Sequence, residues 1–353
     1  MNTENLYYIA ETAFHHEGNV DFLKKLVIDI SSIEIQAIKF HLLFNVDDYM
    51  VPEHAAIEVI KKISIPEKEW GFIFSLVNDR GKEIVALTND LASLKYINKV
   101  QKQFPISAIE LHSTGLNDIF LLEEAVRFNK TVMIGVGGSS FDEIKFAVDF
   151  LSDKGKSDIL LMHGFQNYPT SYEDINFKRI VFYQNAFNLP VGYADHTDPN
   201  DIENPMISVL PAMYGVKVFE KHVTNVFGEN RIDSQAAVSI ETMQEVVKKG
   251  ETLFKTLGNS NIEFSKAERN YGDTGPMKKA LVARRTICKG EIINQEDIAY
   301  KRIEESSTLS QKDILKIIGS KALRTINENE LLSFANIEYN FRRQSTVQFF
   351  INK

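Results

Sequence analysis

GVKVFEKHVT, residues 215–224, is the stretch that decides the fold. Its apolar start, Gly215 to Val218, predicts a buried strand, and this strand ends in three adjacent ionisable residues, Glu220, Lys221 and His222. Burying charge is costly, so such a cluster at a strand end indicates either a paired structural network or a functional site.

This strand is the eighth in a regular alternation. From Tyr7 to about Glu220, short β-rich runs alternate with segments whose apolar residues recur at helical spacing, which indicates repeated βα units. The expected strands, mostly about 25 to 30 residues apart, are 7–10, 36–40, 83–87, 108–111, 131–135, 158–162, 190–194 and 215–219. Eight βα units in about 250 residues favour a (β/α)8 TIM barrel within the α/β class.

A doubly wound open sheet would also alternate strands and helices. The polar residues favour the barrel, because functional groups of a barrel gather at the carboxyl ends of its strands. The residues expected at those ends are Glu11, Lys39, Thr88, Ser113, Gly135, His163, His196 and His222.

A second, smaller domain is expected beyond the barrel. We predict a barrel domain over 1–260, a linker over 261–279 that contains NYGDTGP at 270–276, a small β-rich domain over 280–340, and a tail over 341–353. The two halves of the small domain share one form, a strand-like run followed by a turn and an apolar pair.

Composition excludes several classes of protein. The chain has 353 residues, 44% of them hydrophobic, and a formal charge of -8 with scattered Lys and Arg, which argues against non-specific nucleic-acid binding. The lone Cys288 excludes an internal disulfide framework and fits a reducing compartment. No run approaches a membrane span and the start lacks a signal-peptide pattern, so we expect a soluble cytoplasmic protein without membrane contact.

Two histidines are candidate metal ligands. His196 follows the seventh strand in GYADHTDP and His222 ends the eighth, and neighbouring strand ends of a barrel converge on one mouth. Two hydrogen-bonded core histidines are the alternative. The adjacent Asp195 and Glu220 could orient the imidazole rings.

Glu11 and Lys39 end the first two strands. The carboxylate could serve as general acid or base and the ammonium could hold an anionic substrate, although an ion pair between the strands explains both equally well. GVGGSS, residues 135–140, could bind an anion through backbone amides at a helix start, or could simply form a tight strand-to-helix turn.

Residues after the sixth strand suit a polyol. Gln166 and Tyr168 could hydrogen-bond a sugar, although Tyr168 and Pro169 could equally shape the loop, and His163 could belong to the core.

In this order, these pieces resemble the sialic acid synthase family, the nonulosonate synthases that condense phosphoenolpyruvate with an N-acetylated sugar. The resemblance spans about residues 6 to 340. It is carried by YIAETAFHHEGN at 8–19, AIKFH at 37–41, NYPTSYEDIN at 167–176, GYADHTDP at 192–199 and FEKHVT at 219–224. The carboxy-terminal segment, with Lys301 and Arg302, is similar to the family's antifreeze-like (SAF) domain.

The resemblance implies roles for matching residues. His196 and His222 would bind a manganese or magnesium ion that polarises the aldehyde of an open-chain N-acetylated amino sugar. Glu11 would bind or activate the sugar, and Lys39 would contact phosphoenolpyruvate. The other substrate-binding residues would be Thr88, Ser113, Gln166, Tyr168, Asp233 and Arg302. Arg302 would come from the partner of a domain-swapped homodimer.

Several positions depart from the family pattern. Glu110 stands where the family has a lysine, Gly115 where it has a glutamate, and Gly135 and Ala194 where it has serines. An asparagine is replaced by Gln166 and a glutamine-like position by His41.

The departures fall mostly on the phosphoenolpyruvate side. Reversing a charge beside an anionic ligand matters, because two unit charges about 4 Å apart interact by roughly 4 kcal/mol at an effective dielectric of 20. Three hypotheses follow: a divergent nonulosonate synthase, a family member that keeps the metal and sugar side but has lost the standard condensation or uses another donor, and an unrelated metal-dependent barrel aldolase.

Overall fold

The computed structural model describes residues 5–165, 167–258, 261–273, 277–305 and 307–339. The chain divides into two compact units, Met1–Gly258 and Asn259–Lys353. The described part of each unit has its own cluster of buried hydrophobic residues.

The first unit is a closed parallel barrel. Its strands pair in chain order and β1 pairs with β8, so the sheet closes on itself. The strands are β1 (Tyr7–Glu11), β2 (Ala37–Leu42), β3 (Glu83–Thr88), β4 (Ile106–Leu111), β5 (Thr131–Gly135), β6 (Ile159–His163), β7 (Val191–Asp195) and β8 (Val218–Thr224). The short β9 (Val238–Ser239) extends the sheet from β8. The predicted TIM barrel is therefore confirmed.

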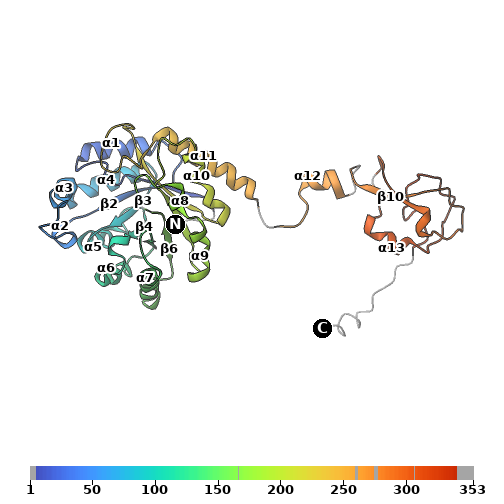
Figure 1. The fold of residues 1–353 in the computed structure, drawn as a ribbon, viewed down its shortest axis with the longest axis horizontal. Coiled ribbons are helices and arrows are strands. Elements are labelled where there is room, and N and C mark those ends of the chain that lie inside the picture. Colours follow the sequence, from blue (N-terminus) through green and yellow to red (C-terminus); the bar gives the residue numbers. More distant parts are fainter. Residues whose placement is uncertain (1–4, 166, 259–260, 274–276, 306, 340–353) are drawn as a thin grey trace. The chain divides into compact units, whose positions relative to one another are not determined.

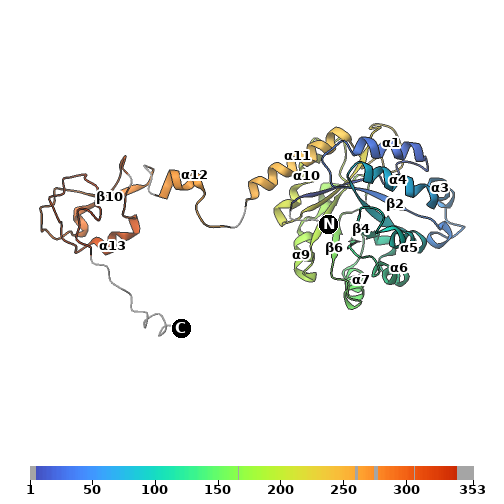
Figure 2. The same cartoon turned by 180° about the vertical axis from the view of Figure 1, so that it is seen from behind.

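Helices surround the strands, as Figures 1 and 2 show from opposite sides. They are α1 (Val20–Ile30), α2 (Val46–Tyr49), α3 (Ile57–Ile63), α4 (Glu67–Asp79), α5 (Leu91–Val100), α6 (Ile119–Ala125), α7 (Phe141–Asp153), α8 (Tyr172–Ile175), α9 (Lys178–Phe187), α10 (Asn204–Ile207) and α11 (Ile240–Leu257). Helix α1 shows the common pattern: its buried residues Leu23, Leu26, Val27 and Ile30 recur at helical spacing, and the side chain of Asn19 caps its first turn.

Alternate residues of each strand point into the barrel. The apolar floor of the interior is formed by Tyr7, Ile9, Ala37, Val85, Ala108, Met133, Leu160, Met162, Ala194 and Val218. Two residues further along their strands, Glu11, Lys39, Glu110 and Glu220 share this inward face and are all buried. The strand period therefore brings four ionisable groups together near the carboxyl ends of the strands.

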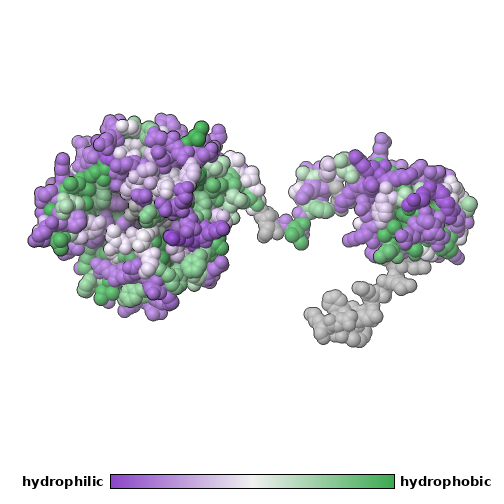
Figure 3. Space-filling view, viewed as in Figure 1, coloured by the Kyte–Doolittle hydropathy of each residue, from purple (hydrophilic) through white to green (hydrophobic). Residues whose placement is uncertain are grey.

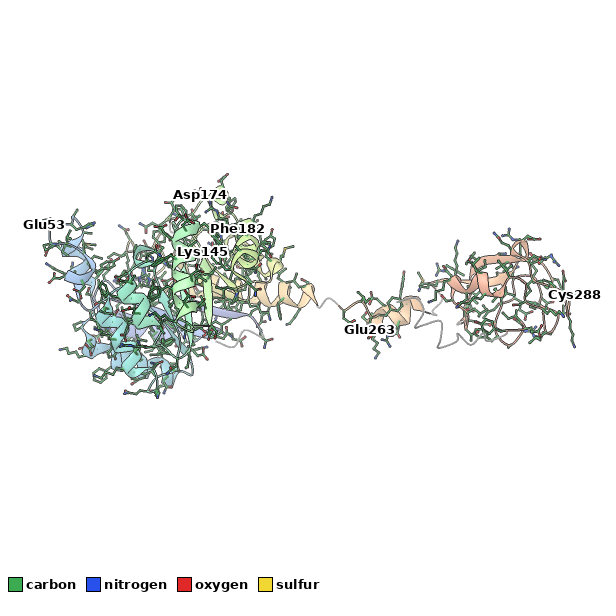
Figure 4. The ribbon with its side chains drawn as sticks, turned by 90° about the horizontal axis from the view of Figure 1, so that it is seen from below. Glu53, Lys145, Asp174, Phe182, Glu263 and Cys288 are labelled. Carbon is green, nitrogen blue, oxygen red and sulfur yellow. The ribbon has the colours of Figure 1, made fainter. Side chains whose placement is uncertain are left out.

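The second unit is small and β-rich. Strands β10 (Lys279–Ala283) and β11 (Ile298–Arg302) pair antiparallel, and isolated bridges such as Ile287 with Ile326 link the later turns. Among the described residues beyond β11 it has one α-helix, α13 (Ile314–Ile317), preceded by a 3₁₀ turn (Gln311–Asp313), while α12 (Lys266–Glu268) and a π-helical turn (Arg269–Asp273) precede β10. Cys288 is exposed on this unit, as Figure 4 shows.

The described residues contain no helix that is both long enough and apolar enough to cross a membrane. Figure 3 shows a largely hydrophilic surface on the face in view, with apolar patches along the barrel unit's edge near α6, α7 and α9. The exposed apolar residues on these helices include Ile119, Phe120, Phe141, Phe146 and Phe182, the last of which is labelled in Figure 4.

Candidate active site

Three buried side chains converge at the carboxyl end of the barrel. Glu11 ends β1 and lies opposite His222 of β8 in the strand register, and His196 directly follows β7. Each offers one ligand atom, and these three atoms all lie within 4.8 Å of one another. The structure thus brings the two predicted metal ligands together and adds Glu11 as a third candidate.

The protonation of these groups suits a cation. Burial, assisted by repulsion from His222, lowers the pKa of His196 to about 3, so its imidazole is neutral at physiological pH. Burial alone would raise the pKa of Glu11, but Lys39 and His222 hold it well below its usual range. The Nδ1 atoms of His196 and His222 are buried and form no hydrogen bond with any described residue. Two imidazoles and a carboxylate form a donor set that divalent metals bind, so the residues fit the metal expected from the sequence.

Tyr168 lies beside both histidines. Its ring centroid is 5.4 Å from that of His196 and 5.7 Å from that of His222. Burial, with the negative charges of Asp233 and Glu11, raises the pKa of Tyr168 above its usual value, so the phenol keeps its proton. Asp233 accepts a hydrogen bond from the backbone N–H of Phe14 at 3.3 Å. The structure therefore places the predicted sugar-binding residues Tyr168 and Asp233 beside the candidate metal ligands.

Lys39 lies against three carboxylates. Its Nζ is 2.6 Å from Glu110, 2.9 Å from Glu220 and 3.5 Å from Glu11. Burial alone would lower the pKa of Lys39, but these three groups raise it well above its ordinary value, so it stays an ammonium. Burial and the neighbouring Glu11 raise the pKa of Glu220 well above its usual range. The one charge of Lys39 is thus fully compensated within the site.

Lys221, by contrast, points away from the barrel interior and forms an ion pair with Asp195. Asp195 also accepts hydrogen bonds from Tyr193, Thr197 and Ser208. Since Asp195 and Lys221 are opposite in the strand register, the pair ties the end of β7 to β8, one residue before each metal-ligand candidate. Glu220 therefore contacts Lys39 inside the barrel, whereas Lys221 pairs with Asp195 on the outer side of the strands.

Glu110 points into the pocket. It lines a small cavity of about 20 Å³ together with His112, Ser113, Gly135, Gly137, Met162, Gly164, Ala194, His196 and Glu220. A Cβ atom on Gly135 would lie 3.1 Å from Glu110 Oε1, so a larger residue there would press on this carboxylate. Gly135 leaves the space that Glu110 uses.

The GVGGSS segment already holds a carboxylate. Ser140 caps α7, and Glu143 accepts hydrogen bonds from both the N–H and the hydroxyl of Ser140. A Cβ on Gly137 would lie 2.0 Å from the carbonyl oxygen of Gly164, so this glycine permits the close approach of two strand ends. The structure therefore supports the tight strand-to-helix turn, and not an anion-binding site, as the role of residues 135–140.

Thr88 and Ser113 face two adjoining cavities. Thr88 is buried at the end of β3, its hydroxyl has no hydrogen-bond partner in the described part of the chain, and it lines a pocket of about 340 Å³ with Gly115, His54 and His112. Ser113 begins a 3₁₀ turn and lines the small cavity beside Glu110. His112 borders both cavities.

The remaining predicted residues lie elsewhere. Gln166 is outside the described residues. Arg302 ends β11 in the second unit. His163 is a core residue whose Nε2 lies 2.8 Å from the carbonyl oxygen of Ile175.

The structure shows one contact that sequence reasoning did not assign. His41 Nε2 lies 2.5 Å from Glu11 Oε1, and the ring packs edge-on against Phe14. The signal was present in the sequence, because residues two apart in a strand share a face and Lys39 was already assigned to the site.

A closed parallel barrel with a candidate metal-ligand triad and buried charges at its carboxyl mouth defines an enzyme-like TIM barrel site. The chain belongs to the NeuB family, whose model matches residues 42–262, and the SAF domain model matches residues 278–338. The second unit is therefore the expected SAF domain.

Named relatives agree with this membership. The chain is 30% identical to an uncharacterised protein of Methanocaldococcus jannaschii, with 85% of each chain covered. It is 23% identical to N,N'-diacetyllegionaminic acid synthase of Legionella pneumophila, with 94% of each covered. Among solved structures, a putative spore coat polysaccharide biosynthesis protein E of Chromobacterium violaceum shares the fold with a TM-score of 0.77, 21% identity and coverage of 94% of this chain and 99% of that one.

Proposed function

We propose that this chain is a metal-dependent carbon–carbon bond-forming enzyme that extends the aldehyde of an open-chain N-acetylated amino sugar. The observation that supports this best is the convergence of Glu11, His196 and His222 beside Tyr168. Relatives named as synthases of N,N'-diacetyllegionaminic acid, pseudaminic acid and N-acetylneuraminate 9-phosphate support the same class of reaction.

The acceptor side uses the residues around the triad. His196 and His222, with Glu11 as third candidate ligand, would hold manganese or magnesium, which supplies Lewis-acid polarisation of a carbonyl oxygen. Tyr168, which keeps its proton, can donate a hydrogen bond to a sugar hydroxyl, and Asp233 can accept one. Glu11 can hold or move a proton at the sugar, because its carboxylate also contacts His41.

The donor expected from the family resemblance is phosphoenolpyruvate, with Lys39 as its contact and phosphate as the released product, and Thr88, Ser113 and Gln166 are further substrate-binding residues. In the same resemblance, Arg302 of the partner subunit completes the sugar site of a domain-swapped homodimer. Both parts of the proposal rest on matching motifs.

A second candidate function is favoured by one observation, the ion pair between Glu110 and Lys39 at 2.6 Å. In this candidate the chain keeps the metal and sugar side but has lost the standard phosphoenolpyruvate condensation, either as a sugar-binding protein or as an enzyme with a different donor. The reason is electrostatic: an anionic donor would find Lys39 already neutralised and a carboxylate beside it.

One experiment separates the candidates. Purified protein with manganese, phosphoenolpyruvate and a panel of 2-acetamido sugars is assayed for phosphate release, and sugar binding is measured by calorimetry. Release that depends on His196 and His222 supports the synthase. Sugar binding that depends on both histidines without release supports the second candidate, and the absence of any sugar binding contradicts the proposal. Mixing His222→Ala with Arg302→Ala chains tests the shared site, since activity should reappear in mixed dimers.

A further inference from the structure

The Glu11 carboxylate lies between two histidines, one from each of the strands that flank β1. On one side, its Oε1 lies 2.5 Å from Nε2 of His41 in β2. On the other side, its Oε2 lies 3.2 Å from Nε2 of His222 in β8. Because β1 pairs with both β2 and β8, Glu11 presents one oxygen to each ring.

The hydrogen bond between His41 and Glu11 has a defined direction. Burial alone would raise the pKa of Glu11, but Lys39 and His222 hold it well below its usual range, so this group is a carboxylate that can only accept. Nε2 of His41 therefore carries the proton and donates the hydrogen bond. Bonds to an ionised acceptor are stronger than bonds between neutral groups, so this one fixes the orientation of the carboxylate.

The His41 ring is itself held in place. His41 follows Lys39 by two residues in β2 and shares its inward face. The Phe14 ring packs edge-on against the imidazole with the centroids 4.9 Å apart. The N–H of Phe14 donates a hydrogen bond to Asp233 at 3.3 Å. The loop after β1 therefore supports the ring that orients Glu11.

Lys39 competes for the same carboxylate oxygen. Its Nζ lies 3.5 Å from Glu11 Oε1, whereas it lies 2.6 Å from Glu110 and 2.9 Å from Glu220. Glu11 thus has the longest of the three contacts with the ammonium. Without the donor at position 41, the charge of Lys39 would draw Oε1, and with it the whole carboxylate, away from His222.

The other oxygen of Glu11 faces the candidate metal ligands. Atoms that bind one ion at about 2.1 Å lie roughly 3 Å apart. Glu11 Oε2 and His222 Nε2 are separated by 3.2 Å, and the candidate ligand atoms of Glu11, His196 and His222 all lie within 4.8 Å of one another. The bond from His41 therefore leaves Oε2 in a position to serve a metal ion.

Resting on the metal site of the proposed function, we propose that His41 is a positioning residue, which holds the Glu11 carboxylate toward His196 and His222 and prevents it from turning to Lys39. Hydrogen bonds to the carboxylate ligands of a metal typically change its affinity by about 10 to 100-fold. The role depends on an N–H donor at position 41. It does not depend on a change of charge there.

The test is manganese affinity, measured on the full-length protein without sugar or phosphoenolpyruvate from the EPR signal of free manganese. His41→Phe keeps a ring against Phe14 but has no N–H, and we expect it to bind manganese about 10 to 100-fold more weakly than wild type. His41→Leu, a smaller side chain without a donor, should show the same loss. His41→Gln keeps an N–H donor and should recover most of the affinity. His163→Gln, the same substitution at a core histidine, is the matched control and should bind as wild type does.

A double-variant cycle tests whether His41 acts through Glu11. In a Glu11→Gln background, His41→Phe should cause little further loss, because the carboxylate that it orients is gone. Wild-type affinity in both His41→Phe and His41→Leu, or a full second loss in the Glu11→Gln background, would overturn the assignment. A wild type that binds no manganese would overturn it together with the metal site of the proposed function. Manganese binding that depends on His41, without any use of an amino sugar, would contradict the proposed function alone.

Discussion

Glu110 Oε2 lies 2.6 Å from Lys39 Nζ, so residues of β4 and β2 form an ion pair inside the barrel. The reversed charge at position 110 affects the expected donor site only if the Glu110 carboxylate lies near Lys39. The contact shows that it does. Lys39, the residue expected to hold an anionic donor, is therefore already paired with a carboxylate.

Charge at position 110 should set the affinity for phosphoenolpyruvate. Glu110→Gln should strengthen binding and Glu110→Lys should strengthen it further, because each step adds one positive charge at a range where a unit pair is worth roughly 4 kcal/mol at a dielectric of 20. After solvent and counter-charge effects, we expect about tenfold per step. Calorimetry with phosphoenolpyruvate measures the series. Equal affinities in all three proteins would show that the ion pair has no influence on the donor.

Metal binding should depend on His196 and His222 together. Each alanine variant should lose at least about a hundredfold in manganese affinity, since the three candidate ligand atoms lie within 4.8 Å and losing one leaves an incomplete site. Manganese should raise the melting temperature of wild type, and a chelator should reverse the rise. His163→Gln is the control, because His163 bonds a backbone carbonyl away from the triad. Manganese affinity retained by both alanine variants would exclude this metal site.

Breaking the buried Asp195–Lys221 pair should destabilise the barrel. Lys221→Met alone leaves the Asp195 carboxylate buried without its counter-charge, which costs about 3 to 5 kcal/mol. Adding Asp195→Asn should recover part of that loss, because the second charge is then removed as well. Urea unfolding of the single and double variants measures the coupling. Strictly additive losses would mean that the two side chains do not interact.

Acid should destabilise the protein through His16. Burial lowers the pKa of this imidazole to about 3, with smaller contributions from His41 and His15, against about 6.5 in an unfolded chain. Between those values the unfolded state binds the extra proton, so stability is fully present above about pH 6.5 and falls as the pH drops toward 3, by up to about 1.4 kcal/mol per unit.

The variant His16→Asn isolates this effect. An asparagine oxygen can accept the hydrogen bond that His16 Nδ1 takes from the N–H of Gly18, but it does not titrate. Urea unfolding at several pH values should give a shallower acid limb for the variant. Identical limbs for both proteins would remove His16 from the acid response.

The sequence by itself determined the barrel, because eight alternations of strand and helix periods and polar strand ends leave few other solutions. It also predicted that His196 and His222, the two candidate metal ligands, lie close together, because neighbouring strands of a barrel bring the carboxyl-end residues of β7 and β8 to one mouth. The SAF domain followed from the similarity of the carboxy-terminal segment to that domain.

Only the tertiary structure decided how the charges pair. Lys221 and Glu220 are adjacent in sequence, yet one faces the helices and binds Asp195 while the other faces the interior and binds Lys39. The alternation of side chains along a strand predicts that Glu220 and Lys221 point to opposite faces of the sheet. It does not predict which residues they contact, because those residues come from other strands. The same holds for Glu110: its identity was visible in the sequence, whereas its direction depended on the space above Gly135 and on the lysine of β2.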